Sequence, residues 1–270
     1  MTNTTTGSIQ KLIGTITTPI TYSLPINNQP IALQPLLGKT ITLNFTGKIN
    51  CISCQRAINK SFAQGHCFKC FQTLPECDIC IMQPEKCHFT QNTCRNPNWG
   101  KTHCHEPHIV YLANTSGLKV GITRLTQIPT RWIDQGAIQA LPIFQVENRL
   151  QSGIIEAHLR QFVADKTNWR KMLENNASDL DLIAARDELL EKASLVKLGL
   201  NLEVLPKLPV QLTYPLLQKP SKIEQIDPHK TPKTTGILLG IKGQYLIFEH
   251  GVLNIRKFSG YEINFSEQNG

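Results

Sequence analysis

The sequence lacks cysteine everywhere except between Cys51 and Cys104, where all nine of its cysteines lie. It also lacks any run of about 18 apolar residues, which excludes an ordinary membrane-spanning helix. The first residues, MTNTTTGSIQK, do not have the basic-then-apolar pattern of a secretory signal. We therefore expect a soluble protein of the reducing cytoplasm with no membrane partner. In that compartment clustered cysteines hold metal more often than they form disulfides.

A glycine-rich phosphate loop and a dinucleotide fingerprint are also missing, so nothing in the sequence supports a nucleotide cofactor. Acidic residues are fewer than basic ones, and the formal charge is +8. Residues 1–108 carry a net +5 and residues 206–270 a net +3, whereas residues 109–205 are neutral. Basic flanks favour a polyanionic partner such as RNA or DNA, although a solvated surface with a modest excess of cations also explains them.

The strongest signal is a pair of Cys-x-x-Cys motifs, Cys51 with Cys54 and Cys67 with Cys70, which twelve residues separate. This spacing is typical of a tetrahedral zinc site, because each motif bends two thiolates toward one point. Four thiolates close the coordination shell and leave no position for a substrate water. We therefore expect a structural zinc ion here rather than a catalytic one.

Five cysteines remain, and four of them can form a second metal site. The preferred ligands are Cys80, Cys87, Cys94 and Cys104. A set led by the Cys77-x-x-Cys80 pair is an alternative, and loose thiols are another. This second site could hold either zinc, which we favour, or an iron–sulfur cluster, because both are bound by four thiolates. Three histidines are further candidate ligands, although solvated loop histidines are the simpler explanation: His88, His103 and His105.

The chain divides into four segments that together predict an α+β fold. Residues 1–50 are rich in Thr and Ile and are interrupted by Pro, Asn and Gly, so they are expected to be β. Residues 51–106 form the cysteine-rich module, residues 107–204 an α/β domain, and residues 205–270 a second β segment. The two β segments share a strand-and-turn pattern, and we expect them to pair in one sheet or small barrel.

The third segment begins with a hairpin pattern. Residues 108–113 and 118–123 are short apolar runs, and the turn sequence Asn114-Thr-Ser-Gly117 lies between them. Two strands across a four-residue turn form an antiparallel pair.

Three helices are expected after this hairpin. Thr130 caps a short helix through Gln135, and an apolar stripe predicts a helix over 144–164. Ser178 and Asp181 form a capping pair for a last helix.

Several long strings resemble a bacterial family known as domain of unknown function 2797. They cover nearly the whole chain: Ser61-Phe-Ala-Gln-Gly-His-Cys-Phe-Lys-Cys70, Pro84-Glu-Lys-Cys87, Cys94-Arg95, Lys119-Val-Gly-Ile-Thr-Arg124, Arg131-Trp-Ile-Asp-Gln-Gly-Ala137, Gly240-Ile-Lys-Gly-Gln-Tyr-Leu-Ile-Phe248 and Asn254-Ile-Arg-Lys257. The resemblance implies no established activity.

The third segment is also similar to the GIY-YIG nuclease module. That module opens with a hairpin bearing a Tyr on each strand, and continues with a helix bearing an Arg and a later helix bearing a metal-binding Glu. The corresponding residues are Tyr111 and Lys119 on the two strands, Arg131 on the first helix, and Glu156 on the later one. The resemblance implies that Arg131 clamps a phosphate, Glu156 holds a magnesium ion, and Tyr111 orients or deprotonates a water.

Two departures separate this chain from that module. Lys119 replaces the second Tyr, and Gln135 stands where a His would follow the Arg. A Lys can neutralise phosphate, so phosphate binding is retained where the usual proton transfer is not. Taken without the resemblance, Glu156 is an ordinary helix residue that pairs with an Arg four positions later.

We therefore keep two hypotheses. The first is a zinc-containing nucleic-acid-binding protein in which exposed aromatic rings stack bases and cations meet phosphates. The proposed cations are Lys60, Lys69, Arg124 and Lys242, and the rings are Phe62, Phe68, Phe71 and Tyr245. Packing of a small metal module explains the same rings without any ligand. The alternative is a magnesium-dependent nuclease, or an enzyme that processes or modifies tRNA, using Tyr111, Lys119, Arg131 and Glu156.

Overall fold

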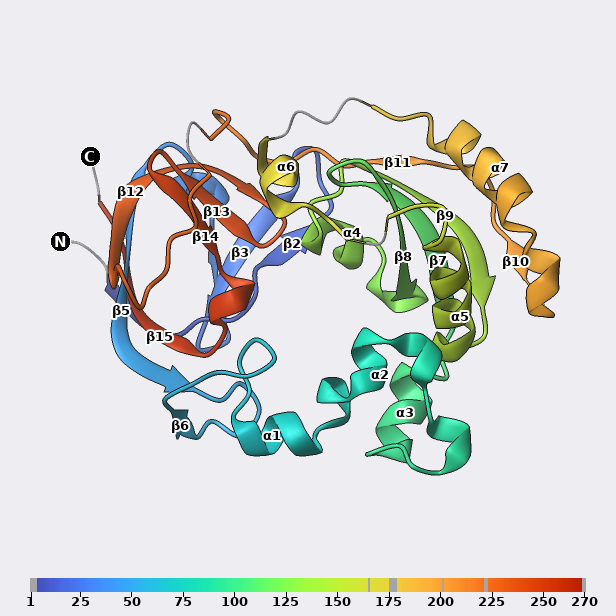
Figure 1. Cartoon of the computed structure of the whole chain (residues 1–270). Coiled ribbons are helices and arrows are strands. Elements are labelled where there is room, and N and C mark those ends of the chain that lie inside the picture. The colour runs from blue at the N-terminus through green and yellow to red at the C-terminus, as the bar shows by residue number, and fades with distance from the viewer. Residues whose placement is uncertain (1–3, 165, 175–178, 201, 221–222, 269–270) are drawn as a thin grey trace. The chain divides into compact units, whose positions relative to one another are not determined.

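A computed structural model describes residues 4–164, 166–174, 179–200, 202–220 and 223–268, and its helices and strands confirm the α+β class (Figure 1). The chain forms two compact units. Unit 1 consists of Met1–Phe71, Leu173–Asn175 and Thr213–Gly270, and unit 2 of Gln72–Met172 and Asn176–Leu212. The division into four segments stays a prediction. No helix in the described part of the chain is long and apolar enough to cross a membrane.

Unit 1 is built on a sheet that joins both ends of the chain, in the order β1-β15-β5-β12-β13-β14 with β6 against β5. Its strands are β1 (Thr4–Ser8), β5 (Thr40–Asn50), β6 (Ala57–Ile58), β12 (Lys233–Lys242), β13 (Tyr245–Phe248), β14 (Gly251–Asn254) and β15 (Tyr261–Glu267). The long strand β5 lies antiparallel between β15 and β12, which confirms the expected pairing of the first and last segments. Closure into a barrel stays a prediction.

Alternation of side chains explains why these segments form strands. In β12 the residues from Lys233 to Leu238 alternate between exposed and buried. This two-residue period is typical of a strand that packs one face on a core. A separate three-stranded sheet in unit 1 contains β2 (Ile13–Thr15), β3 (Thr21–Ile26) and β4 (Gln29–Ala32). Short 3₁₀ turns are η1 (Gln34–Leu36) and η7 (Arg256–Phe258).

Unit 2 is built on a second antiparallel sheet in the order β10-β9-β7-β8, with β11 also against β9. Its strands are β7 (His108–Asn114), β8 (Leu118–Arg124), β9 (Gln139–Val146), β10 (Glu203–Val204) and β11 (Val210–Gln211). Strands β7 and β8 confirm the predicted hairpin, and every residue of β7 is buried. Because the sheet order ends at β8, that strand lies at an edge.

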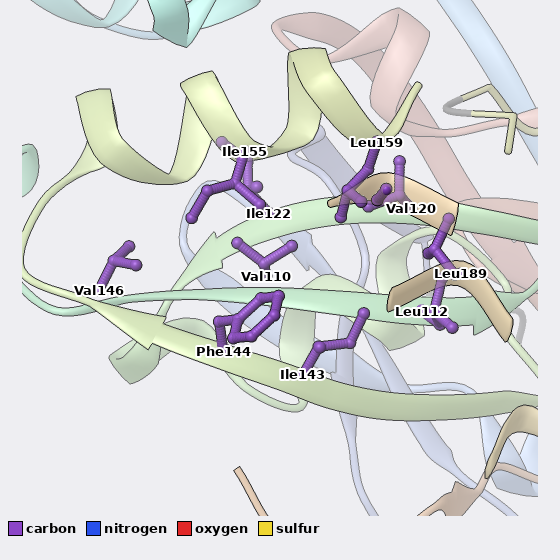
Figure 2. Packing of buried hydrophobic residues seen from close by; sticks show 11 residues of the cluster. Val110, Leu112, Val120, Ile122, Ile143, Phe144, Val146, Ile155, Leu159 and Leu189 are labelled. Carbon is purple, nitrogen blue, oxygen red and sulfur yellow. The ribbon is translucent and has the colours of Figure 1, made fainter. Parts of the chain in front are cut away.

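Two longer helices of unit 2, α5 (Arg149–Leu159) and α7 (Leu182–Ala193), cover one face of this sheet. Figure 2 shows Ile155 and Leu159 of α5 directed at the strands that carry Val110 and Ile122. The short helix α4 (Thr130–Asp134) packs against side chains on the other face of the sheet. Its Trp132 ring meets the Tyr111 ring of β7 edge to face, with the ring centroids 5.9 Å apart. The remaining elements here are η5 (Leu125–Gln127) and η6 (Leu195–Leu198), and α6 (Trp169–Glu174) begins in unit 2 and ends in unit 1.

The helix expected over 144–164 was placed too early. Residues up to Val146 belong to strand β9, and the helix begins only at Arg149 after the Asn148 cap. The short apolar run of β9 is buried on a sheet, and a run of that length does not separate strand from helix by its period. Asp181 caps α7 through the amides of Ile183 and Ala184, whereas Ser178 lies outside the described residues.

The cysteine-rich part of the chain has only short elements. In order they are α1 (Phe68–Thr73), η2 (Pro75–Cys77), α2 (Ile79–Met82), η3 (Pro84–Lys86), η4 (Phe89–Gln91) and α3 (Pro97–His103). Within unit 2, η3 packs closely on α5: a Cβ added at Gly153 would lie 2.5 Å from the Cβ of Pro84. Arg160 and Glu85 add an ion pair at 3.5 Å. The helix that carries Glu156 is therefore fitted against the second part of the cysteine module.

Candidate metal centres and anion pocket

The first four cysteines of unit 1 form one cluster, here called cluster 1: Cys51, Cys54, Cys67 and Cys70. Their sulfur atoms all lie within 4.8 Å of one another, and the Cys54 and Cys67 sulfurs are 3.8 Å apart. Four zinc–sulfur bonds of about 2.3 Å in a tetrahedron place the sulfurs about 3.8 Å from one another, which is the separation of the Cys54 and Cys67 sulfurs. The cluster can therefore hold a metal ion, as the spacing predicted.

Backbone amides point at the sulfurs of cluster 1. The amide of Cys67 donates to the Cys51 sulfur at 3.2 Å, and the amide of Cys70 donates to the Cys67 sulfur at 3.4 Å. Burial raises the pKa of Cys51, but the backbone amides around it outweigh burial and bring that pKa down to about 6. The fold thus favours the thiolate form of Cys51, which metal ligation requires. The neighbouring Cys67 sulfur, followed by burial, raises the pKa of Cys70 to about 12, so a metal ion would have to displace the proton of that thiol.

The preferred second set lies together in unit 2 and is here called cluster 2: Cys80, Cys87, Cys94 and Cys104. All four line one cavity of about 10 Å³, which is about the space of a single water-sized sphere. Cys77, the alternative ligand, is not among the residues that line this cavity. The four therefore border one small space, but their sulfurs are not all within 4.8 Å of one another, and the ligand atoms of the described residues that are this close here belong to Asp78, Cys80 and His88.

Asp78 and His88 also line this cavity, and their ligand atoms lie within 4.8 Å of the Cys80 sulfur and of each other. The Asp78 carboxylate already accepts from Arg95 at 3.0 Å and from the amide of Ile79. Burial, followed by the charge of Asp78, raises the pKa of Cys80 to about 11. A divalent ion at cluster 2 would therefore have to displace protons.

The other two candidate histidines have other partners. His103 stacks on Trp99 with ring centroids 4.1 Å apart, and His105 lies against Phe89 at 4.0 Å. The first contact lies within α3, and the second joins the residues just after α3 to η4.

A second constellation lies beside the edge strand of unit 2. Tyr111 projects across its partner Gly121, because a Cβ at Gly121 would lie 2.7 Å from the Tyr111 hydroxyl. The Gln135 carboxamide lies between Tyr111 and Arg131. Since a guanidinium only donates, the carboxamide oxygen faces Arg131 and accepts from its Nε at 3.0 Å, while the amide nitrogen donates to the Tyr111 hydroxyl at 3.1 Å. These residues form a hydrogen-bonded chain on α4 and β7.

Two charges, one on α4 and one on α5, act on Tyr111. Burial raises the pKa of its hydroxyl, the nearby Arg131 guanidinium opposes that rise, and the Glu156 carboxylate adds to it. The phenol therefore stays protonated at neutral pH. Of the four residues that the sequence assigned to a catalytic role, Tyr111 and Arg131 are thus joined through Gln135, and the charge of Glu156 acts on Tyr111.

Lys119, the fourth, is directed elsewhere. It is buried, and its ammonium donates to the Thr167 hydroxyl at 3.4 Å. Arg149, at the first turn of α5, was not predicted. Its Nη2 donates to the Ile81 carbonyl at 2.7 Å. Its electrostatic neighbours are Cys104 and Cys80 of cluster 2, together with Arg131 and Glu156.

The four proposed nucleic-acid-binding cations differ in exposure. Lys60 is exposed in unit 1 with its ammonium 5.3 Å from the Phe62 ring centroid, and Lys69 is exposed on α1. Arg124 is half-buried at the end of β8, and its charge reaches His108. Lys242 is only 1% exposed, with its ammonium over the Tyr214 ring, so its environment is not that of a surface cation.

Aromatic rings gather beside cluster 1. The Phe62 ring lies 5.3 Å from that of Phe68 and stacks on that of Phe71 at 5.9 Å. Phe68 is 54% exposed, although a large apolar ring is ordinarily buried. The surface made by Lys60, Phe62, Phe68, Lys69 and Phe71 is here called the aromatic surface.

Sequence reasoning missed the parts played by Gln135 and Arg149. Gln135 follows Arg131 by four positions, and that helical spacing indicates that the two side chains are neighbours. Arg149 and Glu156 are seven positions apart, which places them on one face of α5. Both signals were present in the sequence.

Comparisons with curated proteins and with solved structures gave no match. The resemblance of the third segment to the GIY-YIG module stays a prediction. A protein-family comparison matches residues 38–263, most of the chain, to a family described as a protein of unknown function. The chain therefore belongs to the family DUF2797, as its motifs predicted.

Proposed function

We propose that this chain is a zinc-containing nucleic-acid-binding protein of the cytoplasm, with a phosphate-binding pocket formed by Tyr111, Arg131, Gln135 and Glu156. RNA or DNA is the partner. The observation that carries the proposal is the hydrogen-bonded chain from Tyr111 through Gln135 to Arg131, and the charge of Glu156 acts on its Tyr111 end. Such a chain fixes the guanidinium in place before any ligand arrives.

Zinc is the proposed metal of both clusters. The donor set of cluster 1 fits zinc because four thiolates at tetrahedral separation, with backbone amides donating to them, are the usual closed structural site. Cluster 2 offers four thiols that line one small cavity, with the ligand atoms of Asp78 and His88 within 4.8 Å of the Cys80 sulfur, so zinc would have to draw the other sulfurs closer. The zinc ions would hold the short elements of the module in place, where no large apolar core can do so.

Arg131 supplies the cation of the proposed pocket. A guanidinium offers a planar fork of donors that matches phosphate oxygens. Its Nε is oriented by Gln135, and the neutral Tyr111 hydroxyl can donate a further hydrogen bond once a ligand is present. An acidic group beside the site would ordinarily repel an anion, so Glu156 fits the pocket best when a divalent cation accompanies the phosphate.

The aromatic surface of unit 1 supports binding to a single strand. Exposed rings stack on bases of any sequence, and adjacent cations meet the phosphates between them. Phe68 with Lys60 and Lys69 provides this combination. Unpaired bases of RNA are the usual partners of such surfaces.

Magnesium-dependent cleavage of a phosphodiester is the second candidate function. The observation that favours it is the influence of the Glu156 charge on Tyr111, because one carboxylate plus waters suffices to hold magnesium. Two observations weigh against it: the phenol of Tyr111 is protonated, and the ammonium of Lys119 is directed at Thr167. We therefore rank binding above cleavage.

Fluorescence anisotropy tests the proposed binding. Labelled single- and double-stranded RNA and DNA are titrated with the zinc-loaded chain at rising salt. We expect affinity to fall steeply with salt, and Arg131→Ala to lower the slope of log affinity against log salt by about 1. Arg170→Ala, an exposed Arg outside the pocket, is the matched control and should leave the slope unchanged. Absence of salt-sensitive binding to all four polymers would refute the proposal.

The same polymers, incubated with magnesium, test the second candidate. Appearance of cleavage products that vanish in Glu156→Gln would establish the enzyme. Equal cleavage by that variant would exclude Glu156 as the ligand of an essential ion.

A further inference from the structure

A polar cavity of about 220 Å³ opens on unit 1, far larger than the cavity at cluster 2. Four parts of the chain form its wall: the end of β1 and the residues after it, the turn between β3 and β4, the start of the first cysteine motif, and the turn before β15. The residues that line it are Ser8, Ile9, Gln10, Asn27, Asn28, Asn50, Ile52, Gln55 and Gly260. None of the functions discussed above uses them.

The chemistry of this lining is unusual for a chain of net charge +8. Five of its side chains are carboxamides, one is a hydroxyl, and none is charged. Without a countercharge the cavity does not select an ion. Each carboxamide offers both a donor and an acceptor, so the lining suits a neutral ligand that carries both.

Hydrogen bonds within the wall use some of these groups and leave others available. Asn27 uses both ends of its carboxamide within the wall, because its oxygen accepts from the Ser8 amide at 2.9 Å and its nitrogen donates to the Thr6 carbonyl at 3.3 Å. Asn50 donates to the Ser8 hydroxyl at 3.1 Å, and Asn28 accepts from Gln10 at 2.6 Å. Among the described residues, nothing pairs with the side-chain oxygen of Asn50 or the side-chain nitrogen of Asn28. An acceptor and a donor therefore remain.

The wall is held by backbone contacts rather than by the ligand. Gly260 donates to the Ile9 carbonyl at 2.8 Å, and Asn50 donates to the Gly260 carbonyl at 2.8 Å. Ile52 lies between Cys51 and Cys54 of the first cysteine motif, so a metal ion at cluster 1 fixes this side of the cavity. A site already ordered before binding loses less entropy when it binds.

We propose that this cavity binds one nucleobase. The edge of an unstacked base presents donors and acceptors side by side, and its two faces are apolar. Asn28, Asn50 and Gln55 meet the edge, and Ile9 and Ile52 meet the faces. The base comes from a free nucleoside or from an unpaired position of a strand. The second source rests on the proposed function, and the first does not.

The test measures dissociation constants of adenosine, guanosine, cytidine and uridine with the full zinc-loaded chain by calorimetry or ligand-observed NMR. We expect at least one nucleoside to bind. Asn50→Ala, Asn28→Gly and Gln55→Gly should each weaken it about tenfold, the usual effect of one lost hydrogen bond with a partner left unpaired. Asn98→Ala removes an exposed carboxamide of unit 2 and should change nothing.

The two glycine variants guard against misfolding. Asn28 and Gln55 have φ of 65° and 59°, a left-handed backbone that glycine adopts without cost, so these variants should unfold at the temperature of the wild type. Binding of no nucleoside, or unchanged binding by the folded variants, overturns the inference. Salt-sensitive strand binding would then still uphold the proposed function. Conversely, nucleoside binding without strand binding would uphold this cavity and refute that function.

Discussion

The two cysteine clusters differ in how the chain builds them. Cluster 1 comes from two short motifs whose backbone amides donate to the sulfurs, and it follows directly from the end of the long strand β5. Cluster 2 is gathered from residues spread between Cys80 and Cys104, around a cavity that Asp78 and His88 also line. Cluster 1 is a local structure, whereas cluster 2 depends on packing over a longer stretch.

That difference assigns each cluster a separate role. Cluster 1 supports the aromatic surface and one wall of the amide-lined cavity in unit 1. Cluster 2 lies in unit 2 beside α5, because the Arg149 amide donates to the Cys104 carbonyl and its side chain to Ile81. Loss of the ion at cluster 1 should therefore damage the aromatic surface and leave the proposed phosphate pocket intact, and loss of the ion at cluster 2 should do the reverse. The variants below test whether the two effects are separate.

The largest effect is expected from Cys67→Ser. This variant removes a central ligand of cluster 1, whose sulfur accepts an amide hydrogen bond. Structural zinc sites contribute about 10 kcal/mol or more to folding of small modules, so unit 1 should lose most of its stability and the chain one zinc ion. Zinc content by mass spectrometry and denaturant unfolding measure both. Retention of full zinc content would contradict the assignment.

Cys104→Ser should cost less stability, because the apolar core of Figure 2 also holds unit 2 together. It should remove the second ion and the phosphate pocket while the aromatic surface keeps its affinity for single strands. Cys77→Ser is the matched control, since Cys77 does not line the cavity of cluster 2. If Cys77→Ser and not Cys104→Ser released the ion, the ligand set led by Cys77 would be the right one.

Gly153→Ala tests the packing between α5 and the second part of the module. The added methyl group would meet Pro84 at 2.5 Å and the Glu85 amide nitrogen at 2.6 Å. Overpacking of this kind costs about 1–3 kcal/mol. In an unhindered helix the same change would add about 1 kcal/mol of stability. Urea unfolding gives the sign directly, and a more stable variant would show that α5 is not held this closely.

Lys60→Ala should have the smallest effect. It removes one cation from the aromatic surface without touching a cysteine, and it should lower the salt slope of single-strand binding by about 1. Lys192→Ala is the control, because Lys192 is exposed on α7 and paired with Glu188. Equal slopes for the two variants would exclude the aromatic surface as the place where phosphates bind.

Local patterns in the sequence predicted local structure well. Each of the Cys51 and Cys67 motifs, and the hairpin of β7 and β8, depends on residues within a few positions of one another. Strand β9 was mistaken for the start of a helix, since a short apolar run suits both. The burial of Lys242 and the amide-lined cavity could not be predicted, because each depends on side chains brought together from distant parts of the chain.

Diffraction at the zinc absorption edge counts and places the metal ions directly. If both clusters hold zinc, it will show two anomalous peaks per chain, one among the sulfurs of Cys51, Cys54, Cys67 and Cys70 and one among those of Cys80, Cys87, Cys94 and Cys104. A single peak, or a signal at the iron edge in place of the second, would contradict zinc binding at both clusters.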